Sequence, residues 1–148
     1  MARIETTVLN LLTANPSIFS IVGLRAFDKD YRADGWQNAP IPVMDGDSVM
    51  LPTLVVVNEE GVHPLGAPMN ARRQFVIVWA FGNASDEGYD DVQAILDLSN
   101  AVLAASAEVA PIPGVDIKWT GEMGPFKFDD GCVGRYDYSI SGIPAIGG

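Results

Sequence analysis

The stretch Arg72–Phe81 reads RRQFVIVWAF and is the strongest strand signal in the chain. Alternate residues of a strand point to opposite faces, which here are Phe75, Ile77, Trp79, Phe81 and Val76, Val78, Ala80. Because both faces are apolar, both need cover. A second apolar run, Leu54–Val57, precedes this stretch, and Pro52 just ahead of it indicates an outer strand. The two runs predict adjacent strands joined by a long, Gly/Pro-bearing connection.

Helical periodicity flanks this hairpin on both sides. The first helix is predicted from Ile4 to about Ala14, where Asn15-Pro16 ends it. The short apolar run Ile18–Val22 either extends this helical packing or starts a strand. A longer helix is predicted from the N-cap Ser85 to about Ala107, with acidic residues in its first turn. Trp79 and Ile95 are the strongest core candidates.

Strands close the chain. Alternation predicts strands at Val115–Trp119, Phe126–Phe128 and Val133–Ser141. Since hairpins outnumber βαβ crossovers in this order, the fold class is α+β, an antiparallel sheet of four to five strands with helices packed mainly on one face. We expect a single domain over residues 1–148. It carries a long loop at 27–50, a hairpin arm at 58–71 and a flexible C-terminal tail at 142–148.

The charge balance and the hydropathy of the sequence indicate which kinds of partner the protein is expected to bind. The 148 residues contain 9 Lys and Arg against 19 Asp and Glu, a formal net charge of −10. Affinity for nucleic acid comes largely from cations that neutralise phosphates, so tight DNA binding is not expected. No apolar run approaches the length of a membrane span, and no secretory signal is recognisable, so we expect a reducing, aqueous compartment.

The candidates for chemistry are isolated residues. His63 is the single histidine and has only Glu59 and Glu60 near it in sequence. Cys132 is the single cysteine, and this histidine-poor chain offers it hardly any base, so a structural role is expected. The acidic run from Asp28 begins like a calcium loop, but its later ligand positions hold Arg32, Ala33 and Ala39. We therefore expect no catalytic residue, metal site or cofactor.

Loops supply the candidate assembly contacts. Val62, Leu65 and Met69 are apolar residues in the Gly/Pro-bearing arm, with no periodic reason for burial in their own subunit. The arm either projects toward a neighbouring subunit or folds back over its own sheet. Arg72 and Arg73 are the only adjacent basic pair, and either close over the sheet end or meet an acidic partner. For the aromatic residues, a core or interface role is favoured over base stacking; they are Trp79, Trp119, Tyr136 and Tyr138.

Taken together, the element order resembles the phage tail terminator (tail completion) family of long-tailed bacteriophages and gene-transfer particles. The resembling features are the N-terminal helix ending at Asn15-Pro16, the Leu54–Val57 and Arg72–Phe81 hairpin, the acidic-capped helix from Ser85 and the closing Val115–Ser141 hairpin. They cover most of the chain as element order and size, without a signature motif. The long Phe27–Met50 loop departs from the pattern.

The resemblance implies a structural, non-enzymatic virion protein. It would form a homohexameric ring that caps the tail tube, ends tube polymerisation and joins the tail to the head connector or neck protein. DNA would pass the acidic lumen without specific binding, and no membrane would be involved. The place would be the head–tail junction, after assembly in the bacterial cytoplasm. A neck or head–tail adaptor subunit is the nearest alternative, and a small-molecule binding module is a distant one.

Overall fold

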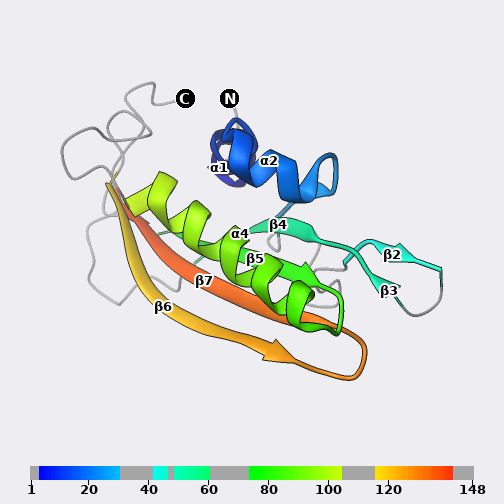
Figure 1. Ribbon diagram of the computed structural model, residues 1–148. Coiled ribbons are helices and arrows are strands. Elements are labelled where there is room, and N and C mark those ends of the chain that lie inside the picture. The colour runs from blue at the N-terminus through cyan, green and yellow to red at the C-terminus, as the bar shows by residue number, and fades with distance from the viewer. Residues whose placement is uncertain (1–3, 31–41, 47–48, 61–73, 105–115, 142–148) are drawn as a thin grey trace.

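The computed structural model describes residues 4–30, 42–46, 49–60, 74–104 and 116–141. In these ranges the chain forms helices and strands of an α+β fold (Figure 1), which confirms the predicted class. The helices are α1 (Ile4–Thr13), α2 (Pro16–Val22) and α4 (Asp86–Ala104). The strands are β1 (Ala26–Asp30), β2 (Met44–Asp45), β3 (Val49–Met50), β4 (Thr53–Glu60), β5 (Gln74–Gly82), β6 (Asp116–Lys127) and β7 (Cys132–Ser141).

Five strands form the main sheet in the order β1-β4-β5-β7-β6, and β2 pairs with β3 in a separate hairpin. The pairs β4–β5, β5–β7 and β6–β7 are antiparallel, as predicted, whereas β1 pairs with β4 in parallel. The prediction that Pro52 introduces an outer strand is wrong. Because β1 pairs alongside β4, the apolar run Leu54–Val57 lies inside the sheet with strands on both sides.

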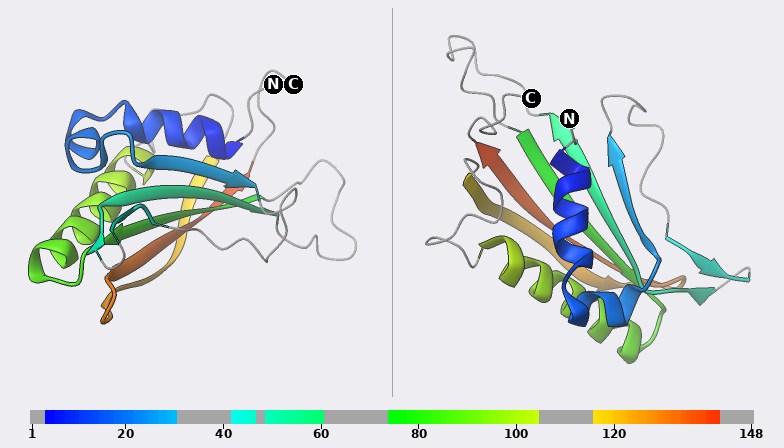
Figure 2. Two further views of the ribbon diagram at one scale, coloured as in Figure 1. Left: turned by 90° about the vertical axis from the view of Figure 1, so that its right-hand side faces the viewer. Right: turned by 90° about the horizontal axis from the view of Figure 1, so that it is seen from above.

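The main core lies between the sheet and the three helices of the described ranges, which cover one face of the sheet (Figure 2). Ile95 is fully buried there, as predicted. Each strand of the sheet contributes every second residue, because alternate side chains point to the same face. Each helix contributes the apolar residues along one side of its axis. The fully buried aliphatic members from the helices are Val8, Leu12, Ile18, Val22, Val92, Ile95, Leu96 and Leu103.

A smaller cluster occupies the other face of the sheet, which we call the open face. Val55 and Val57 of β4 lie there beside Ile77 and Phe81 of β5, and all four are buried. Trp79, the other residue predicted in the core, packs against this smaller cluster and is only partly buried, so it lies on the opposite face of the sheet from Ile95. The reason is that successive side chains of a strand point to opposite faces. Val78 and Ala80 point toward the helices, so Trp79 between them points to the other face of the sheet.

Capping side chains explain where the helices begin. Asn15 caps α2, because its Oδ1 accepts hydrogen bonds from the backbone N–H groups of Ser17 and Ile18 at 2.9 and 3.2 Å. The sequence left open whether Ile18–Val22 is helical or starts a strand. The structure shows that this run belongs to the helix α2. Ser85 caps α4, where its Oγ accepts from the Gly88 N–H at 3.0 Å. The predicted end of this helix near Ala107 lies outside the described residues.

Two strand predictions need correction. The region 27–50 is not a loop throughout, because it contains most of β1 and the hairpin of β2 and β3. β1 has no alternation of apolar and polar residues, so its sequence does not indicate a strand. It forms a strand because its backbone pairs with that of β4. The separate strands predicted around Trp119 and Phe126 are one strand, β6, whose pairing with β7 shifts register near Gly121 and again before Phe126. These irregularities interrupt the alternation that the sequence would otherwise show.

Candidate assembly surface

The described residues contain no cluster of potential metal ligands, since no three His, Cys, Asp or Glu side chains among them lie together so as to hold a metal ion. Cys132 is buried in the main core, as its structural interpretation predicted, and burial raises the pKa of its thiol. Of the helices in the described ranges, none has the length and hydropathy needed to cross a membrane. The features that stand out are exposed apolar side chains.

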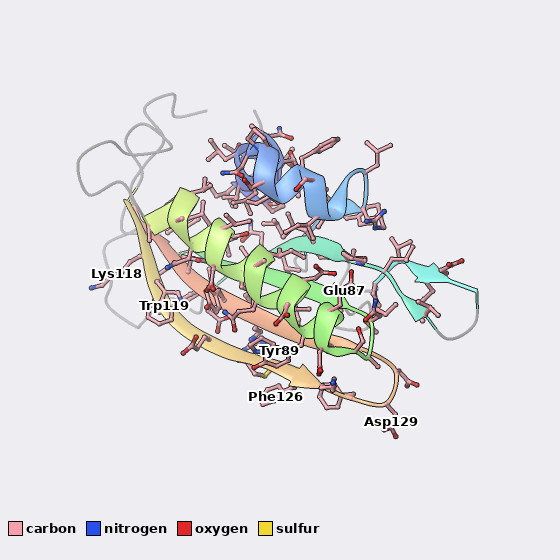
Figure 3. The ribbon with its side chains drawn as sticks, in the orientation of Figure 1. Glu87, Tyr89, Lys118, Trp119, Phe126 and Asp129 are labelled. Carbon is pink, nitrogen blue, oxygen red and sulfur yellow. The ribbon has the colours of Figure 1, made fainter. Side chains whose placement is uncertain are left out.

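The first exposed group lies on the edge strand β6 and the turn after it. We call it the β6 strip, and its members are Trp119, Met123, Phe126 and Phe128. Trp119 is 45% exposed with its ring 5.9 Å from that of Tyr136, and Phe126 is 48% exposed with its ring 6.2 Å from that of Phe128. A long edge strand with exposed aromatic side chains favours association with another chain. Figure 3 shows Trp119 and Phe126 along this strand.

Carboxylates line the first turns of α4 beside the strip. Asp86, Glu87 and Asp90 are exposed, and Tyr89 between them is exposed as well. The Lys127 Nζ lies 2.8 Å from Asp86 Oδ1, and this hydrogen bond and ion pair lower the pKa of Asp86. The pKa of Asp91 is raised, first by burial and then by the charges of Glu87 and Asp90. This end of α4 is therefore an acidic surface, and the ion pair between Asp86 and Lys127 connects it to β6.

The second exposed group is the hairpin of β2 and β3, which extends away from the main sheet in Figure 1. Its Met44 and Val49 are 39% and 43% exposed. The base of the hairpin is anchored, since the Val43 N–H donates to Thr53 Oγ1 at 3.1 Å and the Leu51 N–H donates to Val43 O at 2.8 Å. The hairpin is thus held firmly while its outer apolar side chains face solvent.

Met50 fixes the hairpin to the end of the sheet. A Cβ atom at Gly131 would lie 2.6 Å from Met50 Sδ and 2.8 Å from the Gly82 carbonyl oxygen. Only glycine leaves room for this contact, which places the hairpin beside the β6–β7 turn. The direction of the hairpin therefore follows from packing against the sheet.

The open face carries one polar cluster. The Arg135 guanidinium lies 5.3 Å from the centre of the Trp79 ring, and the same ring stacks on Phe81 at 6.1 Å. Arg135 Nε lies 3.3 Å from Asp137 Oδ1. Burial raises the pKa of Asp137 more than Arg135 lowers it. The cluster has the composition of an interface, a tryptophan and an arginine beside apolar neighbours.

The assembly contacts predicted from sequence are Val62, Leu65, Met69, Arg72 and Arg73, and they lie outside the described residues, as does His63. Of the aromatic set, Tyr136 and Tyr138 are in the core, whereas Trp119 is on the surface. The sequence interpretation missed the β6 strip and the β2–β3 hairpin as surfaces. The available signals were the Phe126-Lys127-Phe128 repeat beside an acidic turn and the apolar residues Met44 and Val49 in a turn-rich region.

The similarity found to known proteins is structural. No family model matches the chain, and no curated protein does either. Among solved structures, the chain is similar to one from the virion of a native gene transfer agent (GTA) particle, with a TM-score of 0.58. The two are 12% identical, and the match covers 94% of this chain and 93% of the other. At this identity the match shows that the two chains share a fold over nearly their whole lengths.

Proposed function

We propose that this protein is a structural, non-enzymatic virion subunit of the phage or gene-transfer-particle type. More specifically, we propose a tail terminator that forms a ring on the end of the tail tube. The observation that carries this proposal is the match over almost the whole of both chains to a chain of a gene transfer agent virion. A partial match would indicate a shared motif, whereas this one includes helices and sheet together.

The surface fits a subunit that is covered by other subunits. The β6 strip and the β2–β3 hairpin expose large apolar side chains from well-anchored elements. Two different contact surfaces on one chain are what a head-to-tail ring requires, because each copy then presents one surface to each neighbour. The number of subunits that we propose, six, comes from the resemblance to tail terminators.

Charge fits a ring around a path for DNA. The formal net charge is −10, and carboxylates gather on the first turns of α4. A lumen lined with such side chains would let phosphates pass without adhesion. We propose that the tube protein and a head connector or neck protein contact the two ends of the ring.

We further propose that the arm between β4 and β5 contributes assembly contacts through Val62, Leu65, Met69, Arg72 and Arg73. The arm begins after Glu60, since Asn58–Glu60 pair with β5. Replacing residues 62–69 with a short Asn-Gly turn is expected to leave the melting temperature unchanged and to abolish rings on tail tubes. Unfolding of this variant would instead show that the arm covers its own sheet, and normal tube capping would remove its assembly role.

The experiment that tests the function is deletion of the gene from a particle-producing strain, followed by electron microscopy of the products. A terminator predicts tails of excessive and variable length without heads, because tube polymerisation is no longer stopped. A neck adaptor predicts tails of normal length that remain unjoined. Normal particles of full infectivity or transfer activity would contradict both structural roles.

A further inference from the structure

The strand edges that have no partner in the described structure include the outer edges of β6 and β2. β6 pairs only with β7 within the described residues, and β2 pairs there only with β3. A hairpin of two short strands has little stability of its own in water, so an additional partner strand would stabilise it. β6 is a twelve-residue edge strand with exposed aromatic side chains. Such edges are usually blocked by charge or covered by another chain.

The outer edge of β2 presents backbone groups at Met44. The Leu51 N–H bonds to Val43 O, so Val43 and Leu51 form a hydrogen-bonded pair of the antiparallel ladder. Met44 is opposite Met50 in the next, non-hydrogen-bonded pair. In such a pair the N–H and C=O groups point away from the partner strand. Met44 therefore offers a donor and an acceptor to a strand arriving on the outer side of β2.

The side chains on the two edges complement each other in one register. Lys118 and Trp119 at the start of β6 are both exposed and point to opposite faces. An antiparallel pairing that places Met44 opposite Trp119 places Asp45 opposite Lys118. Both cross-strand pairs are favourable, one apolar and one of opposite charge. Neither Asp45 nor Lys118 has an ion pair with any residue that the structure describes.

A single chain cannot make this contact with itself. The hairpin packs through Met50 on Gly131, beside the first residue of β7, whereas Lys118 pairs with Ser139 near the other end of that strand. Seven residues of β7 separate the two places, which is roughly 23 Å at the usual rise of a strand. Figure 3 shows Lys118 and Trp119 at the end of the molecule far from the hairpin.

We propose that the partner at each edge is a second copy of this chain. β2 of one subunit pairs antiparallel with the start of β6 of the next, with Met44 over Trp119 and Asp45 beside Lys118. The charge complementarity of Asp45 and Lys118 favours this occupant over an unrelated protein. The contact joins two different surfaces, so it repeats head to tail, and it gives the proposed ring when the rotation from one subunit to the next closes. The inference rests on the ring of the proposed function and names the contact that builds it.

A charge exchange tests the pairing in the full-length protein, with association measured by sedimentation velocity and rings observed by electron microscopy. Asp45→Lys and Lys118→Asp are each expected to weaken association by about tenfold or more, because each variant brings like charges together. The chain with both substitutions is expected to recover most of the lost affinity. The matched control combines Lys118→Asp with Asp129→Lys, which exchanges a carboxylate in the β6–β7 turn and is expected to give no recovery. Melting curves verify that every variant is folded.

Disulfide capture gives an independent measurement. Chains carrying Asp45→Cys are mixed with chains carrying Lys118→Cys and oxidised with diamide, since directly opposed cross-strand residues are close enough to be linked. A covalent dimer containing one chain of each kind is expected, and Cys132 does not interfere because it is buried. Replacing Lys118→Cys by Asp129→Cys in the mixture is the control and is expected to give no such dimer.

The outcomes separate the pairing from the ring. Recovery in the double variant together with the mixed dimer supports the pairing. Rings of the unaltered protein without recovery and without the mixed dimer overturn the pairing and leave the proposed ring intact. If the unaltered protein forms no ring in solution or on tail tubes, both the pairing and the ring are wrong.

Discussion

At the residue scale, Tyr138 shows how a polar group is accommodated in the main core. Its side chain is fully buried and its hydroxyl donates to Asn100 Oδ1 at 2.9 Å, while burial raises its pKa. Tyr138→Phe is expected to lower the free energy of unfolding by about 1 kcal/mol, since one net hydrogen bond is lost. Urea denaturation measures this. Combining it with Asn100→Ala should cost less than the sum of the two single changes, and strict additivity would contradict the bond.

Ile95 and Phe126 contrast core and surface at the same scale. Ile95 has no exposed surface, whereas Phe126 is about half exposed on the β6 strip. Ile95→Ala is expected to cost about 2–5 kcal/mol of stability because it leaves a cavity. Phe126→Ala is expected to cost less than about 1 kcal/mol in the monomer, as surface changes usually do. Equal losses in denaturant titrations would show that Phe126 belongs to the folding core and not to a contact surface.

At the element scale, the acidic start of α4 carries a pH-dependent cost. The pKa of Asp91 is raised by burial and by Glu87 and Asp90, so the folded state disfavours its ionised form. The folded protein therefore binds more protons than the unfolded chain between the two pKa values, and stability falls as pH rises through that window. Above the folded pKa the full cost remains. Asp91→Asn removes it at neutral pH.

The expected gain for Asp91→Asn is about 0.3 kcal/mol at pH 7, the size of one like-charge contact along a helix. It should vanish near pH 3, where the carboxyl is protonated in both states. Thermal melts at the two pH values measure the difference. Asp129→Asn, a change in the exposed β6–β7 turn, is the control and should be neutral at both. A gain that persists undiminished at pH 3 would show that charge is not its cause.

At the scale of the whole molecule, the net charge determines how strongly the protein is expected to bind DNA. A net charge of −10 repels phosphate on average. No retention on duplex DNA is expected at physiological salt, because few cations are available to displace condensed counterions. Fluorescence anisotropy with a labelled duplex measures this. A sub-micromolar dissociation constant at that salt would remove the argument for a passive DNA conduit.

The sequence by itself determined the elements with strong periodicity. The apolar runs of β4 and β5, the helix capped by Ser85 and the alternation of β7 each carry their own pattern, and together they define an α+β fold. Net charge and the single cysteine were also readable directly. These properties are local or additive, so they need no knowledge of which residues meet.

Only the tertiary structure decided the rest. β1 has no apolar alternation and exists through pairing with β4, so β4 became an inner strand despite Pro52. Trp79 took the open face because its neighbours in sequence took the helix side. The β2–β3 hairpin is directed by Met50 packing on Gly131, about 80 residues away in the chain, and the exposure of the β6 strip follows from its edge position. Contacts between distant residues set these features, and local sequence patterns do not encode them.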